Sequence, residues 1–300
     1  MATLRTGDTL ELGGLTGPDE TEIYARVFEI DNGDTVMSRT HVLVGNGQRF
    51  DLLRTFEVEI VDILHLPAAG LLCLSGRGAL FRYSGGSWST LSDPIQPPAR
   101  VSQLIPAGGR LHAIGPATAA YRLEETGGWS RLPLPDEDVH VLDLAQDPRG
   151  RLILCGTDGY LASLDGEVAT RIDLPTDAHL CGVWCSEAGT WVCGFGAQLF
   201  HSEADGWEML DTGEIETDFL QFVRFGDKLL MAAETDILEV LPAGIIPFSE
   251  IENRRLAVIG ASLFSSTPDA AFQLTEAGWS DIDIAFDLPD EPTATAQPRG

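Results

Sequence analysis

The chain has 300 residues and carries 46 acidic residues against 19 lysines and arginines, which gives a net charge of −27. A surface this acidic repels nucleic-acid phosphates and anionic lipids, so we expect neither nucleic acid nor a membrane as a partner. It attracts cationic proteins and speeds their association, so we expect a protein partner with a basic surface. A general solubility surface or a salt-adapted host would account for the same charge.

No apolar run approaches the roughly 18 residues of a membrane span, and the N-terminal residues lack the charged and apolar regions of a secretion signal. The five cysteines show no disulfide-framework spacing. Cys181 and Cys185 would lie about 13 Å apart on a strand, too far for a shared ion or a disulfide. We therefore expect a cytoplasmic protein whose cysteines are buried, unpaired thiols.

Two series of markers recur along the chain in a constant phase. The first is a turn glycine between two apolar runs, at Gly33, Gly70, Gly109, Gly150, Gly189, Gly226 and Gly260. The second marks a glycine-bearing turn that enters a strand, at Gln48, Trp88, Trp129, Val168, Trp207, Ile245 and Trp279. Successive turn glycines are 34 to 41 residues apart, a spacing typical of propeller blades.

Each unit is predicted to form four short strands. In the fourth copy these strands are 139–145, 151–155, 160–164 and 168–174. Asp147–Gly150 supplies the first turn, where proline sets φ and glycine tolerates the left-handed region that hairpins require. The runs are too short for helices and are rich in valine, isoleucine, leucine and aromatic residues, which favour strands.

These units predict an all-β fold, a seven-bladed β-propeller of four-stranded antiparallel blades, in which the ring leaves only short, protected sheet edges. A stacked solenoid would need capping units at both ends, and none is visible. The first and last copies are the weakest, so six or eight blades stay open as alternatives. The first copy nevertheless contains Asp31-Asn32-Gly33-Asp34, the strongest hairpin signal of the chain.

We divide the chain into an N-terminal arm at 1–22, a propeller at 23–285 and an acidic, polar tail at 286–300. Within the arm, Thr9–Leu12 is expected either to add a strand that closes the ring against the last blade or to fray. The tail has little apolar material to bury, so we expect it to be disordered.

The up-and-down order of the strands decides which loops share a face. The first and third turns of each blade lie on one side, here called the turn face, together with both marker series. The second turns and the crossovers between blades lie on the other side, here called the loop face. We expect the loop face to bind the partner, because the two marker series occupy the opposite face and leave these loops available.

On the loop face we predict an acidic arc over blades 4 to 6 with one exposed aromatic residue. Its predicted partner-binding residues are Asp136, Glu137, Asp138, Asp158, Asp177, Phe195, Glu216, Asp218, Glu234 and Asp236, with Glu214 beside them. Across from it we predict a shorter basic arc of Arg254, Arg255, Arg39, His41, Arg77 and Arg100. Exposed aromatic and arginine side chains are the types that anchor interfaces. For any single residue the alternative is a solvated loop side chain.

Enzymatic motifs are mostly absent. The chain has no GKS or GKT, no strand–GxGxxG–helix unit, no HExxH and no CxxC pair, so we predict no cofactor, no metal and no catalytic residue. One alternative keeps an enzyme open. His140 and His179, together with Asp158 or Asp218, would approach an ion in the axial channel and support a hydrolase or a lyase.

The segment Tyr83–Thr90, with the sequence Y-S-G-G-S-W-S-T, resembles a degenerate Asp-box of the sialidase and BNR-repeat type, although it lacks the aspartate. The twin glycines Gly85-Gly86 and Gly127-Gly128 resemble those of kelch repeats without their tyrosine–tryptophan spacing. The resemblance implies a propeller over most of the chain. It matches no functional family, so no catalytic residue is carried over from it.

The sequence therefore predicts a non-enzymatic binding protein, a rigid propeller that presents its loop face to a basic partner. One concrete version is a bacterial immunity or antitoxin-like protein that caps a cationic effector. The alternatives are an enzyme with its site in the axial channel and a passive assembly scaffold.

Overall fold

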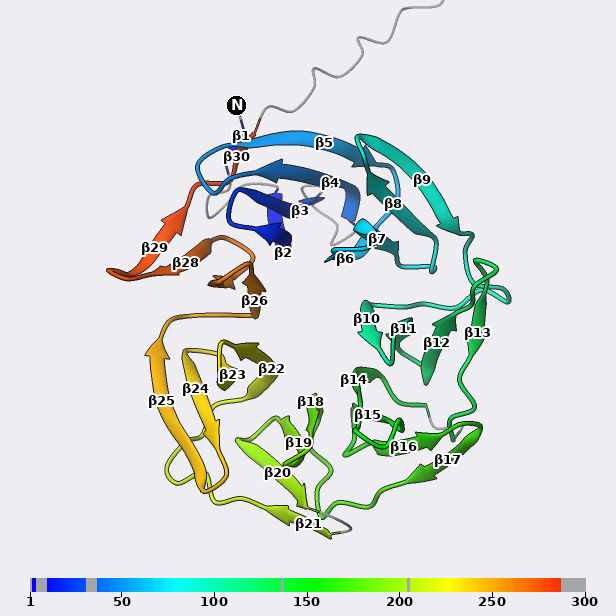
Figure 1. The fold of residues 1–300 in the computed structure, drawn as a ribbon, viewed down its shortest axis with the longest axis vertical. Coiled ribbons are helices and arrows are strands. Elements are labelled where there is room, and N and C mark those ends of the chain that lie inside the picture. The colour runs from blue at the N-terminus through cyan, green and yellow to red at the C-terminus, as the bar shows by residue number, and fades with distance from the viewer. Residues whose placement is uncertain (1, 4–9, 31–36, 136–137, 204–205, 287–300) are drawn as a thin grey trace, which may run out of the picture.

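The structure, a computed structural model, describes residues 2–3, 10–30, 37–135, 138–203 and 206–286. These residues form strands and turns, with no helix among them. Seven antiparallel sheets of four strands each are arranged in a ring about a common axis (Figure 1). In every sheet the strands follow one another in sequence order, which confirms the predicted seven-bladed β-propeller.

The strands have the following bounds. Blade 1 comprises β2 (Leu10–Asp19), β3 (Glu22–Ile30), β4 (Met37–Gly45) and β5 (Phe50–Phe56), and blade 2 comprises β6 (Ile60–Leu66), β7 (Gly70–Ser75), β8 (Leu80–Ser84) and β9 (Ser87–Ser92). Blade 3 comprises β10 (Gln103–Ala107), β11 (Arg110–Gly115), β12 (Ala119–Leu123) and β13 (Trp129–Arg131), and blade 4 comprises β14 (Val141–Gln146), β15 (Leu152–Gly156), β16 (Leu161–Asp165) and β17 (Val168–Arg171). Blade 5 comprises β18 (Leu180–Ser186), β19 (Gly189–Gly194), β20 (Gln198–Glu203) and β21 (Gly206–Met209), and blade 6 comprises β22 (Phe219–Phe225), β23 (Lys228–Ala233), β24 (Asp236–Leu241) and β25 (Gly244–Glu250). Blade 7 comprises β26 (Arg255–Ile259), β27 (Ser262–Ser266), β28 (Ala271–Thr275) and β29 (Gly278–Ile282), and outside the blades β1 (Ala2–Thr3) pairs with β30 (Ala285–Phe286).

Blade 1 differs from the sequence prediction in the identity of its first strand. Residues 10–19, which we had assigned to the arm, form β2 and pair with β3. The segment that contains Gly33 therefore joins the second and third strands, not the first and second, and residues 31–36 lie outside the described residues. The β2–β3 register shifts between Leu12 and Gly14, and this glycine-rich irregularity breaks the alternation by which a strand is recognised in a sequence.

The ring is closed without a strand shared between its two ends. Blade 1 and blade 7 each take four strands from one continuous stretch, so the residues at 10–12 pair within blade 1 and do not extend the last blade. Thr9 and the tail residues 287–300 lie outside the described residues. The two ends meet through one apolar cluster, to which blade 1 contributes Leu10, Leu12, Leu15 and Ile23 and blade 7 contributes Ile259, Phe264, Ala271 and Ile282. In addition, the N–H of Leu12 donates to the carbonyl oxygen of Pro268 in blade 7 (2.7 Å).

A polar contact spans the same junction. Arg255 on β26 of blade 7 places Nη2 2.9 Å from Oδ1 of Asp62 on β6 of blade 2, so it passes across blade 1. It runs over Gly14, where a Cβ atom would lie 3.4 Å from Nη1 of Arg255. Arg26 of blade 1 is buried beneath it and donates to the carbonyl oxygens of Ile60 (3.0 Å) and Gly13 (2.6 Å). Arg255, predicted to belong to the exposed basic arc, thus connects three blades.

Side chains on the innermost strands link other neighbouring blades. Asp62 accepts from the backbone N–H of Ile63 (3.0 Å) and from that of Leu104 on β10 (2.9 Å). Asp143 repeats the arrangement between blades 4 and 5, accepting from Leu144 (2.8 Å) and Val183 (2.9 Å). Both aspartates lie where the register of the first strand shifts, and the bulge directs the carboxylate to the next blade.

The tryptophan series has a structural role at the outer edge of the blades. Nε1 of Trp129 on β13 donates to the carbonyl oxygen of Gly78 in blade 2 (2.7 Å), and Nε1 of Trp279 on β29 donates to Oγ of Ser249 in blade 6 (2.8 Å). Trp88 on β9 packs edge to face on Phe56 of blade 1, with ring centroids 5.4 Å apart. The outermost strand of these blades is therefore fixed to the blade that precedes it.

The five cysteines are unpaired, as predicted, but only Cys73, Cys155 and Cys193 are fully buried. Burial raises the pKa of Cys155 and Cys193 well above its usual range. Cys181 and Cys185 are half-buried, and burial raises their pKa to about 12 and about 11. Thiols with pKa values this high are protonated at neutral pH, which makes them poor nucleophiles and poor metal ligands.

We predict that Asp62→Ala lowers the free energy of unfolding by about 3 kcal/mol, because it leaves two backbone N–H groups and Arg255 without their acceptor. Urea unfolding monitored by tryptophan fluorescence measures the loss. Asp51→Ala is the matched control, since Asp51 pairs with Arg49 at 3.5 Å with both side chains largely exposed, and such a pair contributes less than about 1 kcal/mol. Equal, small losses for the two variants would contradict a role of Asp62 in ring closure.

Candidate functional site

The loop face is a set of second turns and crossovers joined by hydrogen bonds. In blade 4, the N–H of Thr157 donates to the carbonyl oxygen of His140 (3.0 Å), and the N–H of His140 donates to Oγ1 of Thr157 (3.0 Å). On the other side of the same turn, the N–H of Gly159 donates to the carbonyl oxygen of Ala178 (2.9 Å). The second turn of blade 4 is thus held between the crossover that enters the blade and the one that leaves it.

The predicted residues Asp158, Phe195 and Asp218 are brought together around His179. The Phe195 ring packs against the His179 ring with centroids 5.3 Å apart, and its N–H donates to the His179 carbonyl oxygen (2.9 Å). Nδ1 of His179 accepts from the N–H of Asp158 (3.3 Å). Asp218 accepts from the N–H of Gly196 (2.8 Å). Phe195 keeps 38% of its surface exposed in this arrangement, and it is the one aromatic residue among the exposed large hydrophobic side chains of the described residues.

The blade 6 part of the acidic arc is built on a buried asparagine that the sequence analysis missed. Asn253 is 1% exposed, and its Nδ2 donates to the carbonyl oxygens of Ala233 (2.6 Å) and Ile251 (3.2 Å). Its own N–H donates to the carbonyl oxygen of Glu234 (2.9 Å). This fixes the turn that carries Glu234 and Asp236. An asparagine in a crossover has no distinctive spacing, so no motif would have revealed it.

The structure describes seven of the nine acidic residues predicted to bind a partner, while Asp136 and Glu137 lie outside the described residues. Asp138, Asp158, Asp177, Glu216 and Glu234 are exposed, and Asp218 and Asp236 are half-buried. All seven belong to second turns, crossovers or the residue that follows a turn, as the strand order predicted. Whether they form one continuous binding surface stays a prediction.

The predicted basic arc is reduced by internal contacts. Arg39 lies 3.4 Å from Oε2 of Glu57. His41 is 2% exposed and contacts Glu29 at 3.5 Å, and burial lowers its pKa despite that carboxylate. Arg255 pairs with Asp62. The other three members of the arc, Arg77, Arg100 and Arg254, are exposed on the loop face.

The two histidines proposed for an axial metal site have other contacts. Nε2 of His140 lies 3.0 Å from Oγ of Ser102, and burial lowers the pKa of His140. Nδ1 of His179 accepts from the N–H of Asp158. Among the residues that the structure describes, no group of three or more histidine, cysteine, aspartate or glutamate side chains is placed to hold a metal ion.

Asp143 is the most perturbed carboxyl group of the innermost strands. Burial raises its pKa to about 7, although the N–H groups of Val183 and Leu144 favour the ionised form. Asp62 at the equivalent place has Arg255 as a partner, whereas within the described part of the chain Asp143 has no cationic partner. With a pKa of about 7, Asp143 gains or loses a proton near neutral pH, and this titration affects the stability of the fold.

Within the described residues, no helix has the length and apolar character needed to cross a membrane. No family model matches the chain. In sequence the chain is similar to Immune protein Tsi7 of Pseudomonas aeruginosa, with 22% identity over 255 residues that span 79% of this chain and 83% of that protein.

Among solved structures, the chain is similar to YCF48 from Cyanidioschyzon merolae, with a TM-score of 0.63 and 13% identity over 91% of this chain and 97% of that one. It is also similar to virginiamycin B lyase from Staphylococcus aureus, with a TM-score of 0.56 and 14% identity over 95% and 92% of the two chains. At these identities the shared feature is the propeller fold. A fold common to a lyase and to other proteins does not select a function.

We predict that the free energy of unfolding decreases as the pH rises from about 4 to about 7, because Asp143 loses its proton in this range. Its pKa is higher in the folded chain than in the unfolded chain, so the folded state binds the extra proton in this window and loses that advantage above it. The loss is about 2 kcal/mol between roughly pH 5 and pH 7. Denaturant unfolding of wild type and Asp143→Asn across this range measures it.

The Asp143→Asn variant is expected to lack this pH slope even if it is less stable at every pH. Asp165→Asn is the matched control, because Asp165 is an exposed turn residue of the same blade. Its profile should run parallel to wild type. Parallel profiles for wild type and Asp143→Asn would contradict the assignment.

Proposed function

We propose that this chain is an immunity-type protein that binds a protein partner through its loop face and neutralises it. The observation that carries the proposal is the likeness to Immune protein Tsi7, which extends over 79% of this chain and so includes most of the blades. The acidic composition supports the proposal, because it favours a partner with a basic surface.

The region around Phe195 is the proposed centre of the interface. An aromatic ring that is 38% exposed and backed by His179 loses water on docking without having to be ordered first. Asp158 and Asp218 lie next to it through their contacts with His179 and Gly196. We infer that a basic side chain of the partner packs on this ring and pairs with these carboxylates.

The remaining carboxylates of the acidic arc are proposed to steer the partner. Asp177, Glu216 and Glu234 are exposed, and charges at the rim of an interface act on the association rate more than on the dissociation rate. The hydrogen-bonded turns of blade 4 and blade 6 limit the conformational change on binding.

As part of the proposal we place the protein in the cytoplasm, where unpaired thiols persist.

The test uses the partner isolated with this protein as bait and then purified as a defined protein. We predict that Phe195→Ala weakens the complex by roughly 10- to 100-fold, as truncation of an interface anchor does. Glu216→Lys is expected to slow association several-fold at low salt and little at high salt. Surface plasmon resonance at two ionic strengths measures both effects.

Asp227→Lys and Glu276→Lys are the matched controls, because both residues are exposed in turns of the opposite face. They change the net charge as Glu216→Lys does, so they separate a local contact from a general charge effect. Loss of binding in the controls together with wild-type binding by Phe195→Ala would move the interface to the turn face and contradict the proposal. Purified partner whose toxicity is unchanged when the complex forms would contradict neutralisation.

A further inference from the structure

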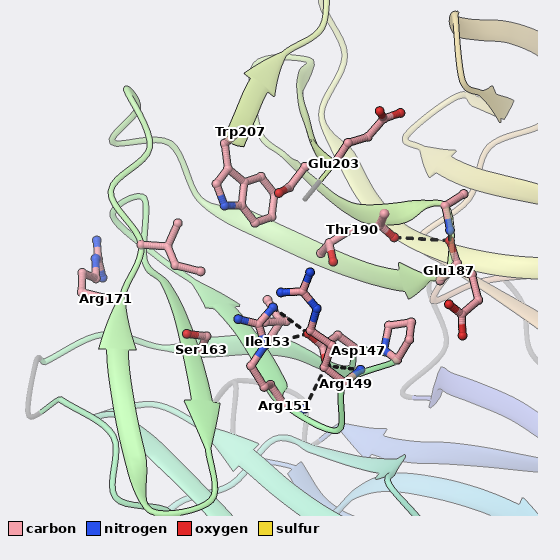
Figure 2. Close-up of a pocket in the computed structure, with 16 residues that line it drawn as sticks. Asp147, Arg149, Arg151, Ile153, Ser163, Arg171, Glu187, Thr190, Glu203 and Trp207 are labelled. Carbon is pink, nitrogen blue, oxygen red and sulfur yellow. Dashed lines mark hydrogen bonds and ion pairs between the residues drawn. The ribbon is translucent and has the colours of Figure 1, made fainter. Parts of the chain in front are cut away.

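A cavity of about 970 Å³ lies between blades 4 and 5 and opens on the turn face, away from the proposed interface (Figure 2). From blade 4 it is lined by the β14–β15 turn and by the faces of β15, β16 and β17 that look toward blade 5. From blade 5 it is lined by the β18–β19 turn and by the ends of β20 and β21. We call this cavity the interblade pocket.

One repeat position carries a small side chain on the blade 4 side of the pocket. On the second strand of each blade, one side chain packs toward the next blade. The position compared here is the residue on the third strand that lies directly opposite it. In blades 2 to 7 the third-strand residues at this position are Arg82, Arg122, Ser163, His201, Glu239 and Gln273. In blade 5 the space is filled by His201, whose ring stacks on Trp191 with centroids 4.0 Å apart. In blade 4 the pair is Ser163 and Ile153, which leaves the space open.

The blade 4 wall of the pocket presents a fixed guanidinium group. Nε and Nη2 of Arg151 both lie 2.8 Å from Oδ2 of Asp147, which is only 7% exposed. Oδ1 of Asp147 accepts from the N–H groups of Arg149 and Arg151 (3.0 and 2.9 Å). The buried carboxylate therefore orients Arg151 while using only some of its five N–H donors. Arg149 is exposed on the same turn and adds a second positive charge.

The blade 5 wall is aromatic and bears acidic groups at its rim. Figure 2 shows the Trp207 indole facing Arg149, Arg151 and Asp147 across the pocket. Glu187 and Glu203 are exposed on this side. The pocket thus has two guanidinium groups on one wall, of which Arg151 is already paired with Asp147, and two carboxylates on the other wall. This arrangement suits a single negative charge better than a phosphate, because the carboxylates repel a dianion.

We propose that the interblade pocket binds a peptide segment of a protein partner by one aspartate or glutamate side chain. The carboxylate sits on Arg151 and Arg149, and the apolar side chain next to it packs on Trp207. Arginine binds carboxylates through paired N–H donors, and the cavity has the volume of a site for a few residues. This second docking site lies on the turn face and does not depend on the function proposed for the loop face.

The test measures binding of two short peptides, acetyl-Gly-Glu-Leu-Gly-amide and the same peptide with glutamine in place of glutamate. The readout is the indole N–H signal of Trp207 in ¹⁵N-labelled protein, assigned by the Trp207→Phe variant. We expect the glutamate peptide to shift this signal in a saturable way and the glutamine peptide to bind roughly tenfold or more weakly. Inorganic phosphate is titrated as a third ligand.

Three variants separate the pocket from a general charge effect. Ser163→Gln introduces the residue that blade 7 carries at the same position, so it should occupy the pocket with a larger, uncharged side chain in a folded protein and weaken binding roughly tenfold or more. Arg149→Gln and Arg151→Gln should each weaken binding roughly tenfold. Arg110→Gln is the matched control and should bind as wild type does, because Arg110 also follows a turn glycine but pairs with Glu125 in blade 3.

Thermal unfolding of each variant verifies that it is folded. Should Arg151→Gln unfold through loss of the partner of Asp147, Ser163→Gln and Arg149→Gln still decide the question. Equal binding of the two peptides, unchanged binding by Ser163→Gln, or no saturable shift of the Trp207 signal would each overturn the proposal. Phosphate binding tighter than that of the glutamate peptide would overturn it as well, since it would make the pocket a phosphate site.

Discussion

The structure depends on closing a ring of seven separate sheets through contacts between the first blade and the last. No strand is shared between blades 1 and 7, so backbone hydrogen bonds do not hold the two ends of the ring together across one sheet. The junction relies on an apolar cluster drawn from both blades and on Arg255, which reaches over Gly14 to Asp62. Both the loop face and the interblade pocket require this closure, because each is assembled from neighbouring blades.

The same physical problem, fixing one blade to the next, is solved near the axis with different residues. Asp62 and Asp143 accept backbone N–H groups from the following blade, while Gln221 donates Nε2 to the carbonyl oxygen of Leu256 (2.8 Å). The direction of the hydrogen bond differs, but each side chain satisfies a backbone group of its neighbour. Asp62 also pairs with the cationic side chain of Arg255, whereas Asp143 has no such partner in the described part of the chain and burial raises its pKa.

The sequence was informative where backbone geometry repeats. Turn glycines such as Gly109, Gly150 and Gly226 adopt positive φ, and the tryptophans occupy equivalent places at the outer edge of the blades. Both residue types therefore recur in the sequence at regular intervals. This was enough to predict the number of blades and the face on which each loop lies. Blade 1 was the exception, because the glycines of β2 interrupt its apolar alternation.

The sequence did not predict features that depend on which distant group a side chain contacts. Arg255 was expected to be exposed and instead joins blades 7 and 2, and the role of Asn253 follows from three carbonyl groups in different segments. The interblade pocket is the clearest case, since a serine in place of a large residue produces no motif. It becomes visible only when cross-strand partners are aligned between blades.

The tryptophan contacts favour assembly of the blades in chain order, because Trp129 and Trp279 bind groups of the blade that precedes their own in the sequence. A growing chain can therefore complete each sheet against a finished predecessor through local contacts, which form quickly, and only the last junction must wait for residues more than two hundred positions apart to meet.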